Sequence, residues 1–197
     1  MPKRTTAELP TPPPTKPDHR PESTFPLTRW PQLTTRPVMV VGIDPGDVHC
    51  GIAIARVEYD PASHEGTITL TRAEEQLPDH TADLLAAWLL EGWVDAVAVE
   101  RFNLDPGKAL EQSGSAMETS QLIGVLRYVV RLANRGRRDQ GVPEVRLYLQ
   151  GRDIKKATRG HARARGIELI SAPTDHPRDA QLHAVHCAAR EVLGWGQ

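Results

Sequence analysis

Residues 38–55 place a short, continuous apolar run directly before a tight turn, and this pattern constrains the fold more than any other stretch. Residues 38–41, Val-Met-Val-Val, are too few for a helix and rich in β-branched side chains, which predicts a buried strand. The run ends at Asp44, and the Pro-Gly pair that follows turns the chain. A second apolar run at residues 51–55 then completes a hairpin.

An acidic residue ends two of the predicted core strands. Asp44 ends the first, and Glu100 ends a second buried run at residues 94–100. Asp44 alone could be a turn aspartate that caps its own loop, or it could be a metal ligand held by a rigid strand. If the two strands are parallel neighbours, their carboxylates emerge side by side and repel unless a cation or a proton lies between them.

The remaining hydrophobic patterns predict one mixed α/β domain. The 39% hydrophobic content is enough for a single core, which we expect in residues 38–197. Period-two and helical spacings predict strands over residues 66–71 and 145–149, and helices over about 80–91, from about 116, and over 177–193.

Residues 1–37 differ in composition from the rest of the chain. They hold ten of the 17 prolines and show no regular apolar period, which predicts a disordered, proline-rich leader. Six Lys and Arg face three acids there, so the leader is either a solvated tail or a weak arm for a polyanion. Trp30 is the residue in it that could pack onto the domain.

Basic residues gather between Arg131 and Arg165, with eleven Lys and Arg against three acids, although the whole chain has a net charge of −1. Charge so segregated favours a phosphate-binding face. It suits a solvated helical surface equally well, because the pattern carries no base-reading signal. The candidate contacts to a DNA backbone are Arg152, Lys155, Lys156 and Arg159.

A third acid lies at the start of the last predicted helix. Pro177 suits the first helical position, which puts Asp179 in the first turn, where the helix dipole favours an anion. His176 precedes Asp179 by three residues, and His183 follows it by four on the same helix face. Taken alone, Asp179 could simply stabilise its helix, and His176 could be a capping or exposed imidazole.

Other classes of protein are less compatible with the sequence. Cys50 and Cys187 form neither a disulfide framework nor a metal-binding spacing, and we expect buried free thiols in a reducing cytoplasm. No stretch is long and apolar enough to span a bilayer, and no apolar signal-peptide core follows the N-terminus. We therefore expect a cytoplasmic protein with no membrane partner.

Three motifs in this order resemble RuvC-type Holliday junction resolvases, in particular the shorter versions of phages and prophages. The motifs are GIDPG at residues 42–46 with Gly51, VE at 99–100 and HPRDA at 176–180, and QLIGVL at 121–126 is also similar. The resemblance covers about residues 38–193. It implies a ribonuclease H-like fold, with a mixed five-stranded sheet flanked by helices. It also implies Mg²⁺- or Mn²⁺-dependent nicking of branched DNA by a homodimer, in recombination or repair in a bacterial or phage-infected cell.

The same resemblance implies roles for individual residues. Asp44, Glu100 and Asp179 match the metal-binding acids of the family. His176 matches a fourth position that the family fills with Asp or His, and Asp175 is the alternative for completing the site. The leader and a compressed segment before the last helix depart from the family pattern.

These residue types suit phosphodiester cleavage. Two hard cations about 4 Å apart can supply both an in-line nucleophile and a stabilised leaving oxygen. Carboxylate oxygens suit such cations, whereas cysteine does not. We expect Asp44 to bridge both cations, with Glu100 on one and Asp179 on the other. His176 would orient the attacking water or stabilise the transition state.

Two other functions compete with this prediction. GIDPG also resembles the first phosphate loop of actin-like ATPases, but the sequence has no second glycine-rich loop of that kind. A non-catalytic nucleic-acid-binding scaffold of the same fold has no need of three converging carboxylates. The sequence therefore predicts an endonuclease for branched DNA, and leaves open which branched structure and which cut sequence it prefers.

Overall fold

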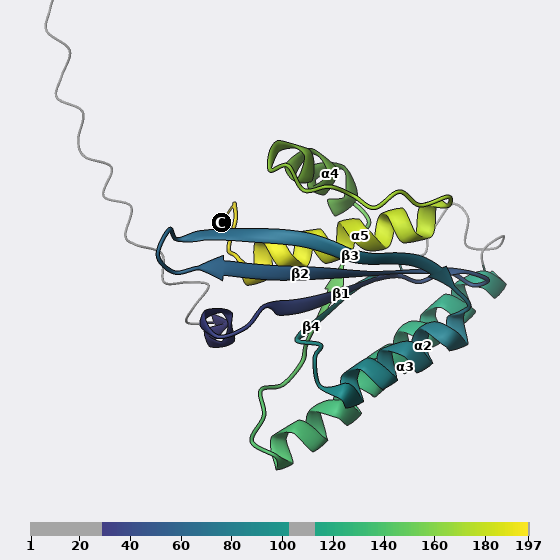
Figure 1. Ribbon diagram of the computed structural model, residues 1–197. Helices are drawn as coiled ribbons and strands as arrows, with labels where there is room; N and C mark the ends of the chain where they lie inside the picture. The colour runs from purple at the N-terminus through teal and green to yellow at the C-terminus, as the bar shows by residue number, and fades with distance from the viewer. Residues whose placement is uncertain (1–28, 103–112, 197) are drawn as a thin grey trace, which may run out of the picture.

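The computed structural model describes residues 29–102 and 113–196. Within them, five strands form one mixed sheet in the order β3-β2-β1-β4-β5. Helices α4 and α5 lie on one side of the sheet, and α2 and α3 lie on the other (Figure 1). The predicted α/β fold with a five-stranded sheet flanked by helices is confirmed.

The elements follow the predicted order with shifted boundaries. The strands are β1 (Val38–Asp44), β2 (Cys50–Asp60), β3 (Glu65–Gln76), β4 (Ala96–Glu100) and β5 (Arg146–Gln150). The helices are α2 (Pro78–Glu91), α3 (Ser113–Asp139), α4 (Ile154–Ala164) and α5 (Asp175–Cys187), with a 3-10 turn η1 (Pro31–Thr34) and a π-helical turn η2 (Ala188–Val192). The basic segment folds as α4, which the apolar periodicity did not predict.

The strand pairing brings the two strand-end acids together. β1 pairs antiparallel with β2 and parallel with β4. Ile43 lies opposite Val99, so Asp44 and Glu100, one residue further along, leave the sheet at the same edge. The expectation that these carboxylates emerge from parallel neighbouring strands is confirmed.

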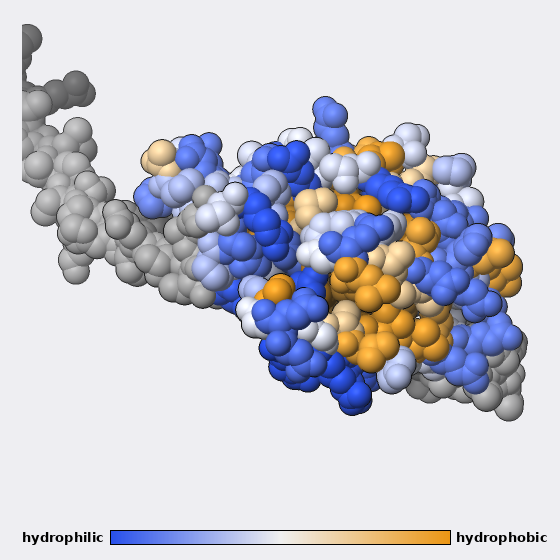
Figure 2. All heavy atoms as spheres, turned by 60° about the horizontal axis from the view of Figure 1, so that its bottom comes forward, coloured by the Kyte–Doolittle hydropathy of each residue, from blue (hydrophilic) through white to orange (hydrophobic). Residues whose placement is uncertain are grey.

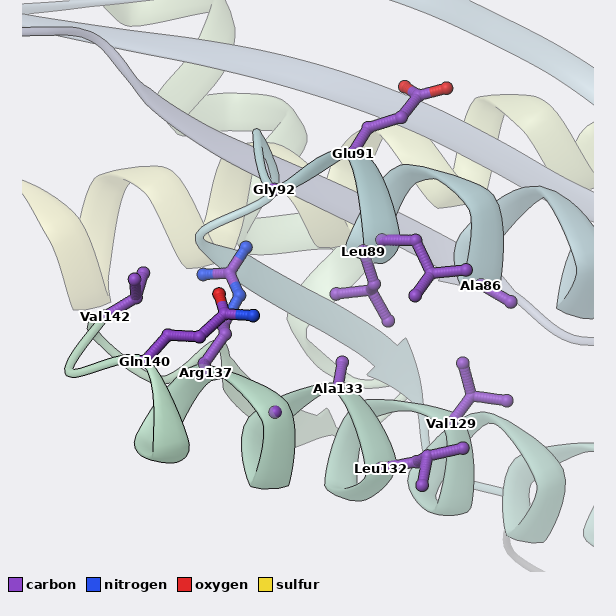
Figure 3. A pocket seen from close by; sticks show the side chains of 12 residues that line it. Ala86, Leu89, Glu91, Gly92, Val129, Leu132, Ala133, Arg137, Gln140 and Val142 are labelled. Carbon is purple, nitrogen blue, oxygen red and sulfur yellow. The ribbon is translucent and has the colours of Figure 1, made fainter.

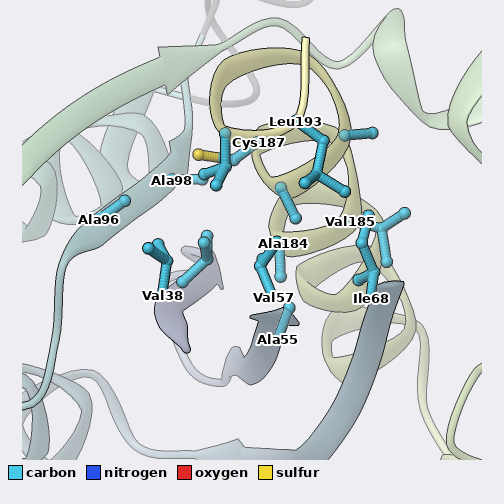
Figure 4. Close-up of a cluster of buried hydrophobic side chains, with 14 of the residues drawn as sticks. Val38, Ala55, Val57, Ile68, Ala96, Ala98, Ala184, Val185, Cys187 and Leu193 are labelled. Carbon is cyan, nitrogen blue, oxygen red and sulfur yellow. The ribbon is translucent and has the colours of Figure 1, made fainter. Parts of the chain in front are cut away.

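Both faces of the central strands are buried, which explains the continuous apolar run in β1. Alternate side chains, including Val40 and Val57, pack against α5 in one cluster (Figure 4). The others, including Ile43 and Ile52, pack against α2 and α3 in a second cluster. The sheet is therefore held rigidly between two cores, with the acids at its end.

The glycines of the GIDPG region let α5 approach the sheet closely. A Cβ atom on Gly42 would lie 2.6 Å from the backbone nitrogen of Ala184. A Cβ atom on Gly51 would overlap the carbonyl of His176 and lie 2.6 Å from the nitrogen of Pro177. Glycine is required at these two positions because helix backbone packs directly on strand backbone.

The end of the predicted leader packs on the domain. Trp30 is 1% exposed, its Nε1 donates to the carbonyl of Glu191 at 2.8 Å, and the guanidinium of Arg146 lies 4.3 Å from the centre of its ring. Arg36 forms a two-pronged ion pair with Asp95. The folded part thus includes residues 29–37, which the composition assigned to the leader, and the predicted disorder of residues 1–28 lies outside the described residues.

Candidate active site

Three carboxylates from separate elements converge on one ammonium group. Nζ of Lys155 lies 3.3 Å from Oδ1 of Asp44, 2.5 Å from Oε2 of Glu100 and 2.6 Å from Oδ2 of Asp179. Asp44 comes from the end of β1, Glu100 from the end of β4 and Asp179 from α5. Because α5 begins at Asp175, two residues before Pro177, Asp179 follows the first turn instead of lying in it as predicted. The structure therefore brings together all three predicted metal ligands.

Burial and close contact shift the acidity of this cluster. Burial, together with the neighbouring Glu100, raises the pKa of Asp44 to about 7. Burial would also raise the pKa of Glu100, but hydrogen bonds with His183, Asp44 and Lys155 outweigh it and hold that pKa well below its usual range. Glu100 is therefore ionised at neutral pH, whereas Asp44 is partly protonated near pH 7.

Lys155 stays charged in spite of its surroundings. Burial lowers its pKa, but the hydrogen bonds to Asp179 and Glu100 outweigh that effect, so its pKa is raised overall. The ammonium thus supplies the cation that the converging carboxylates require.

His176, rather than Asp175, reaches the carboxylates. Nδ1 of His176 lies 2.6 Å from Oδ2 of Asp44, and its side chain remains 39% exposed at the rim of the site. The absence of a side chain at Gly46 makes room for this ring, since a Cβ there would lie 2.9 Å from its Cε1. Asp175 is exposed and pairs with Arg178.

A further histidine, which the sequence placed only on the helix face of Asp179, also belongs to the site. His183 is fully buried, and its Nε2 lies 3.0 Å from Oε2 of Glu100. Its Nδ1 lies 2.8 Å from Oε1 of Gln150, the last residue of β5. Gln150 could have been suspected, because it ends a parallel strand beside Glu100.

The donor set fits a divalent metal ion. Asp44, Glu100 and His183 each offer one ligand atom, and these atoms lie within 4.8 Å of one another. Asp179 contacts the Lys155 ammonium that Asp44 and Glu100 also contact. A positive charge is therefore favourable at this position. Carboxylate oxygens are the usual ligands of Mg²⁺ and Mn²⁺.

The fold of the chain is similar to that of solved structures. The structure of Thermus thermophilus RuvC matches the chain with a TM-score of 0.53 at 23% sequence identity, over 80% of this chain and 97% of that chain. T. thermophilus RuvC in complex with Holliday junction substrate matches with a TM-score of 0.55 at 23% identity, over 78% of this chain and 95% of that chain. The chain has the RuvC fold. No protein-family model and no curated protein matches its sequence.

On this RuvC fold, the four predicted DNA-contacting residues separate into two groups. Lys155 is 13% exposed and lies among the carboxylates. Arg152, Lys156 and Arg159 are exposed, and with Arg163 they follow a spacing of four, three and four residues, with Arg152 just before α4 and the other three within it. We call these four residues the α4 basic face. It borders the site, because Lys155 belongs to the same helix.

The structure also tests the predictions for the two cysteines and for membrane-spanning segments. Cys50 and Cys187 are buried free thiols, as expected. Among the described residues, no helix combines the length and apolar character needed to cross a membrane.

Proposed function

We propose that the protein is a divalent-metal-dependent endodeoxyribonuclease that cuts branched DNA such as Holliday junctions. The observation that carries this proposal is the convergence of Asp44, Glu100 and Asp179 on a single positive charge. The RuvC fold of the chain supports it, since T. thermophilus RuvC has been solved with a Holliday junction substrate.

The carboxylates would hold Mg²⁺ or Mn²⁺ in the arrangement expected from the sequence. Asp44, Glu100 and Asp179 would hold the cations together. When bound, the cations would stabilise the negative charge on the phosphate and on the leaving oxygen. Glu100 is held in its ionised form, whereas Asp44 must first release its proton.

His176 and Lys155 would act on the water and the phosphate. His176 contacts Asp44 at the rim of the site, where an imidazole can orient the attacking water and accept its proton. Lys155 carries its charge at the end of a long, flexible side chain, so it can turn from the carboxylates towards a phosphate oxygen. No covalent nucleophile is needed for this hydrolysis.

The α4 basic face would hold the DNA backbone beside the carboxylates. Its side chains are exposed, three of them at helical spacing within α4 and one, Arg152, just before the helix. Contacts of this kind bind duplex and junction alike, because phosphate contacts carry no sequence information.

A second copy of this chain would supply the symmetry that a four-way junction requires. An apolar groove of about 440 Å³ runs between α2 and α3, and Leu89, Leu90, Val129, Leu132, Ala133 and Val142 are among its lining residues (Figure 3). Leu90 is 85% exposed and Leu132 is 53% exposed. Figure 2 shows an apolar patch on the face of the molecule that lies at the bottom of Figure 1. We call the groove lined by these residues the α2–α3 groove. A two-fold dimer through this groove would bury the patch and present two equivalent sites to two equivalent strands.

A cleavage assay tests the proposed reaction. The purified full chain is incubated with labelled four-way, flap and linear DNA, with and without Mg²⁺. We expect Mg²⁺-dependent cutting of branched DNA, no cutting by Asp44→Asn, and unimpaired cutting by Asp47→Asn, a control at an exposed acid of the same turn. Asp44→Asn should bind junctions at least as tightly as the native protein, because it lacks one negative charge near the phosphate.

The outcomes separate the competing functions. If Asp44→Asn cuts at the native rate, the assigned carboxylates do not carry the reaction. If the native protein binds junctions and never cuts them in Mg²⁺ or Mn²⁺, the chain is a non-catalytic scaffold of this fold.

A further inference from the structure

His183 is a buried histidine beside a carboxylate that the proposed function assigns to the metal. Its ring is fully buried on α5 directly beside the carboxylate of Glu100. Each of its two nitrogens has one partner, Gln150 at 2.8 Å and Glu100 at 3.0 Å. Both partner atoms are oxygens, and this fact sets the chemistry of the ring.

The two nitrogens of His183 face different partners. The amide oxygen of Gln150 accepts hydrogen bonds and cannot donate them, so Nδ1 donates to it. Nε2 then faces Oε2 of Glu100, which is only an acceptor in its ionised form. A positive centre between these two atoms satisfies both, and it can be a proton in the metal-free protein or a divalent cation when one is bound.

Two features of this arrangement are typical of a metal-ligating histidine. Such a residue donates its other ring N–H to a carbonyl, carboxylate or water, as His183 does to Gln150. Two neighbouring ligands at right angles, each about 2.1 Å from an octahedral cation, lie about 3 Å apart. The distance between Nε2 of His183 and Oε2 of Glu100 is 3.0 Å.

We propose that Nε2 of His183 is a ligand of the divalent metal, beside the carboxylates of Asp44 and Glu100. This rests on the proposed metal-dependent function and adds a nitrogen donor to a site that otherwise consists of oxygen donors. A nitrogen donor favours transition metals over Mg²⁺, and the affinity of such a site for divalent ions rises from Mn²⁺ to Co²⁺. The site therefore prefers Co²⁺ over Mn²⁺, and Mn²⁺ over Mg²⁺.

Pulsed electron paramagnetic resonance of bound Mn²⁺ detects a coordinated nitrogen directly. The probe is Mn²⁺ alone, added to the full chain without DNA, with ¹⁴N and ¹⁵N histidine labelling to assign the signal. We expect nitrogen modulation in the native protein, in His176→Ala and in His186→Gln. His186 is the matched control, because it lies on the same helix and contacts Thr158 instead of the carboxylates.

His183→Gln should abolish the modulation while Mn²⁺ still binds. Absence of nitrogen modulation in the native protein overturns the proposal, and this measurement needs no variant that might misfold. Modulation that disappears in His176→Ala and persists in His183→Gln overturns it as well, because it would assign the nitrogen to His176.

Calorimetric titrations with Co²⁺, Mn²⁺ and Mg²⁺ test the selectivity. His183→Gln should weaken Co²⁺ and Mn²⁺ binding by about tenfold or more and Mg²⁺ binding by clearly less. An equal loss for all three ions overturns the nitrogen-ligand assignment. Neither readout requires cleavage, so a protein that binds Mn²⁺ through His183 and cuts no DNA would refute the nuclease and leave this inference standing.

Discussion

The backbone of Gly51 rests directly on the carbonyl of His176, with no room for a side chain between them. This contact joins β2 to the first turn of α5. It sets how deeply that turn enters the end of the sheet, and therefore where His176 and Asp179 stand relative to Asp44. Gly51, which the sequence places at the start of a strand, therefore sets the distance between β2 and α5 at the site.

Substitution of Gly51 by Ala should force α5 away from the sheet. We expect a loss of about 1–3 kcal/mol in the free energy of unfolding, as for other overpacked cores, together with weaker metal binding. Gly124→Ala is the control, because it lies in helix α3 with nothing within 4 Å of its Cβ position, and should gain up to about 1 kcal/mol. Urea unfolding measures both variants, and equal stability of the two would contradict the packing argument.

Lys155→Met should remove the positive charge that neutralises the three carboxylates and leave their oxygens free to bind metal. Without metal, the loss of the ammonium leaves three acids uncompensated, at a cost of about 3 kcal/mol of stability. Mg²⁺ affinity should rise, because no side chain competes for the same oxygens. Calorimetry and thermal melts measure these effects. Lys156→Met should leave both quantities unchanged and reduce the salt slope of DNA binding by about 0.9. A drop in Mg²⁺ affinity for Lys155→Met would count against its place in the cluster.

The stability of the metal-free protein should fall as pH rises through neutrality. The pKa of Asp44 is raised from 3.8 to about 7, so its protonated form favours the folded state. That contribution is present below the unfolded pKa and is lost as pH rises through about 7. Glu100 has a lowered pKa, so its contribution changes in acid, below the range of Asp44. Melting temperatures between about pH 5 and pH 8 test this, and Asp44→Asn should show a flatter profile.

Metal binding should depend on the same proton. Below about pH 7 the metal must displace the proton of Asp44, so apparent affinity should fall by up to about tenfold for each pH unit. Calorimetric titration with Mg²⁺ at several pH values measures the slope. An affinity that does not vary between about pH 5 and pH 7 would exclude Asp44 as a ligand.

Truncations should locate the start of the folded part. Removal of residues 1–28 should leave the melting temperature unchanged, because their proline-rich composition predicts no contribution to the core. Removal of residues 1–35 takes away Trp30, whose burial is worth about 3–5 kcal/mol by comparison with other large core side chains. Trp30→Ala in the full chain separates the side chain from the backbone. Equal melting temperatures for the two truncations would show that Trp30 does not anchor this segment.

A charge in the α2–α3 groove should separate the proposed dimer. We expect light scattering to report a dimer for the native chain and a monomer for Leu132→Glu, with junction cleavage reduced to single nicks. Leu169→Glu changes an exposed leucine outside the groove and should stay dimeric. A native chain that remains monomeric even on junction DNA would rule out the symmetric arrangement.

The sequence by itself determined the features that depend on neighbours along the chain. The β-branched run in β1 and the acids that end β1 and β4 follow from local spacing and turn chemistry, and they appear where they were expected. The predicted helix start at Pro177 is wrong by two residues, because α5 begins at Asp175. The order of elements was enough to suggest the fold.

Only the tertiary structure decided which side chains meet at the end of the sheet. Lys155 enters the carboxylate cluster because of the rotation of α4 about its axis, which also turns Lys156 to solvent. His183 meets Gln150 because α5 crosses the sheet at backbone contact with Gly42 and Gly51. Trp30 is buried because its ring belongs to the hydrophobic cluster on the α5 side of the sheet, with Arg146 over its face and the carbonyl of Glu191 accepting from its Nε1. Spacing along the chain cannot supply these contacts, since each depends on the rigid placement of elements that are distant in sequence.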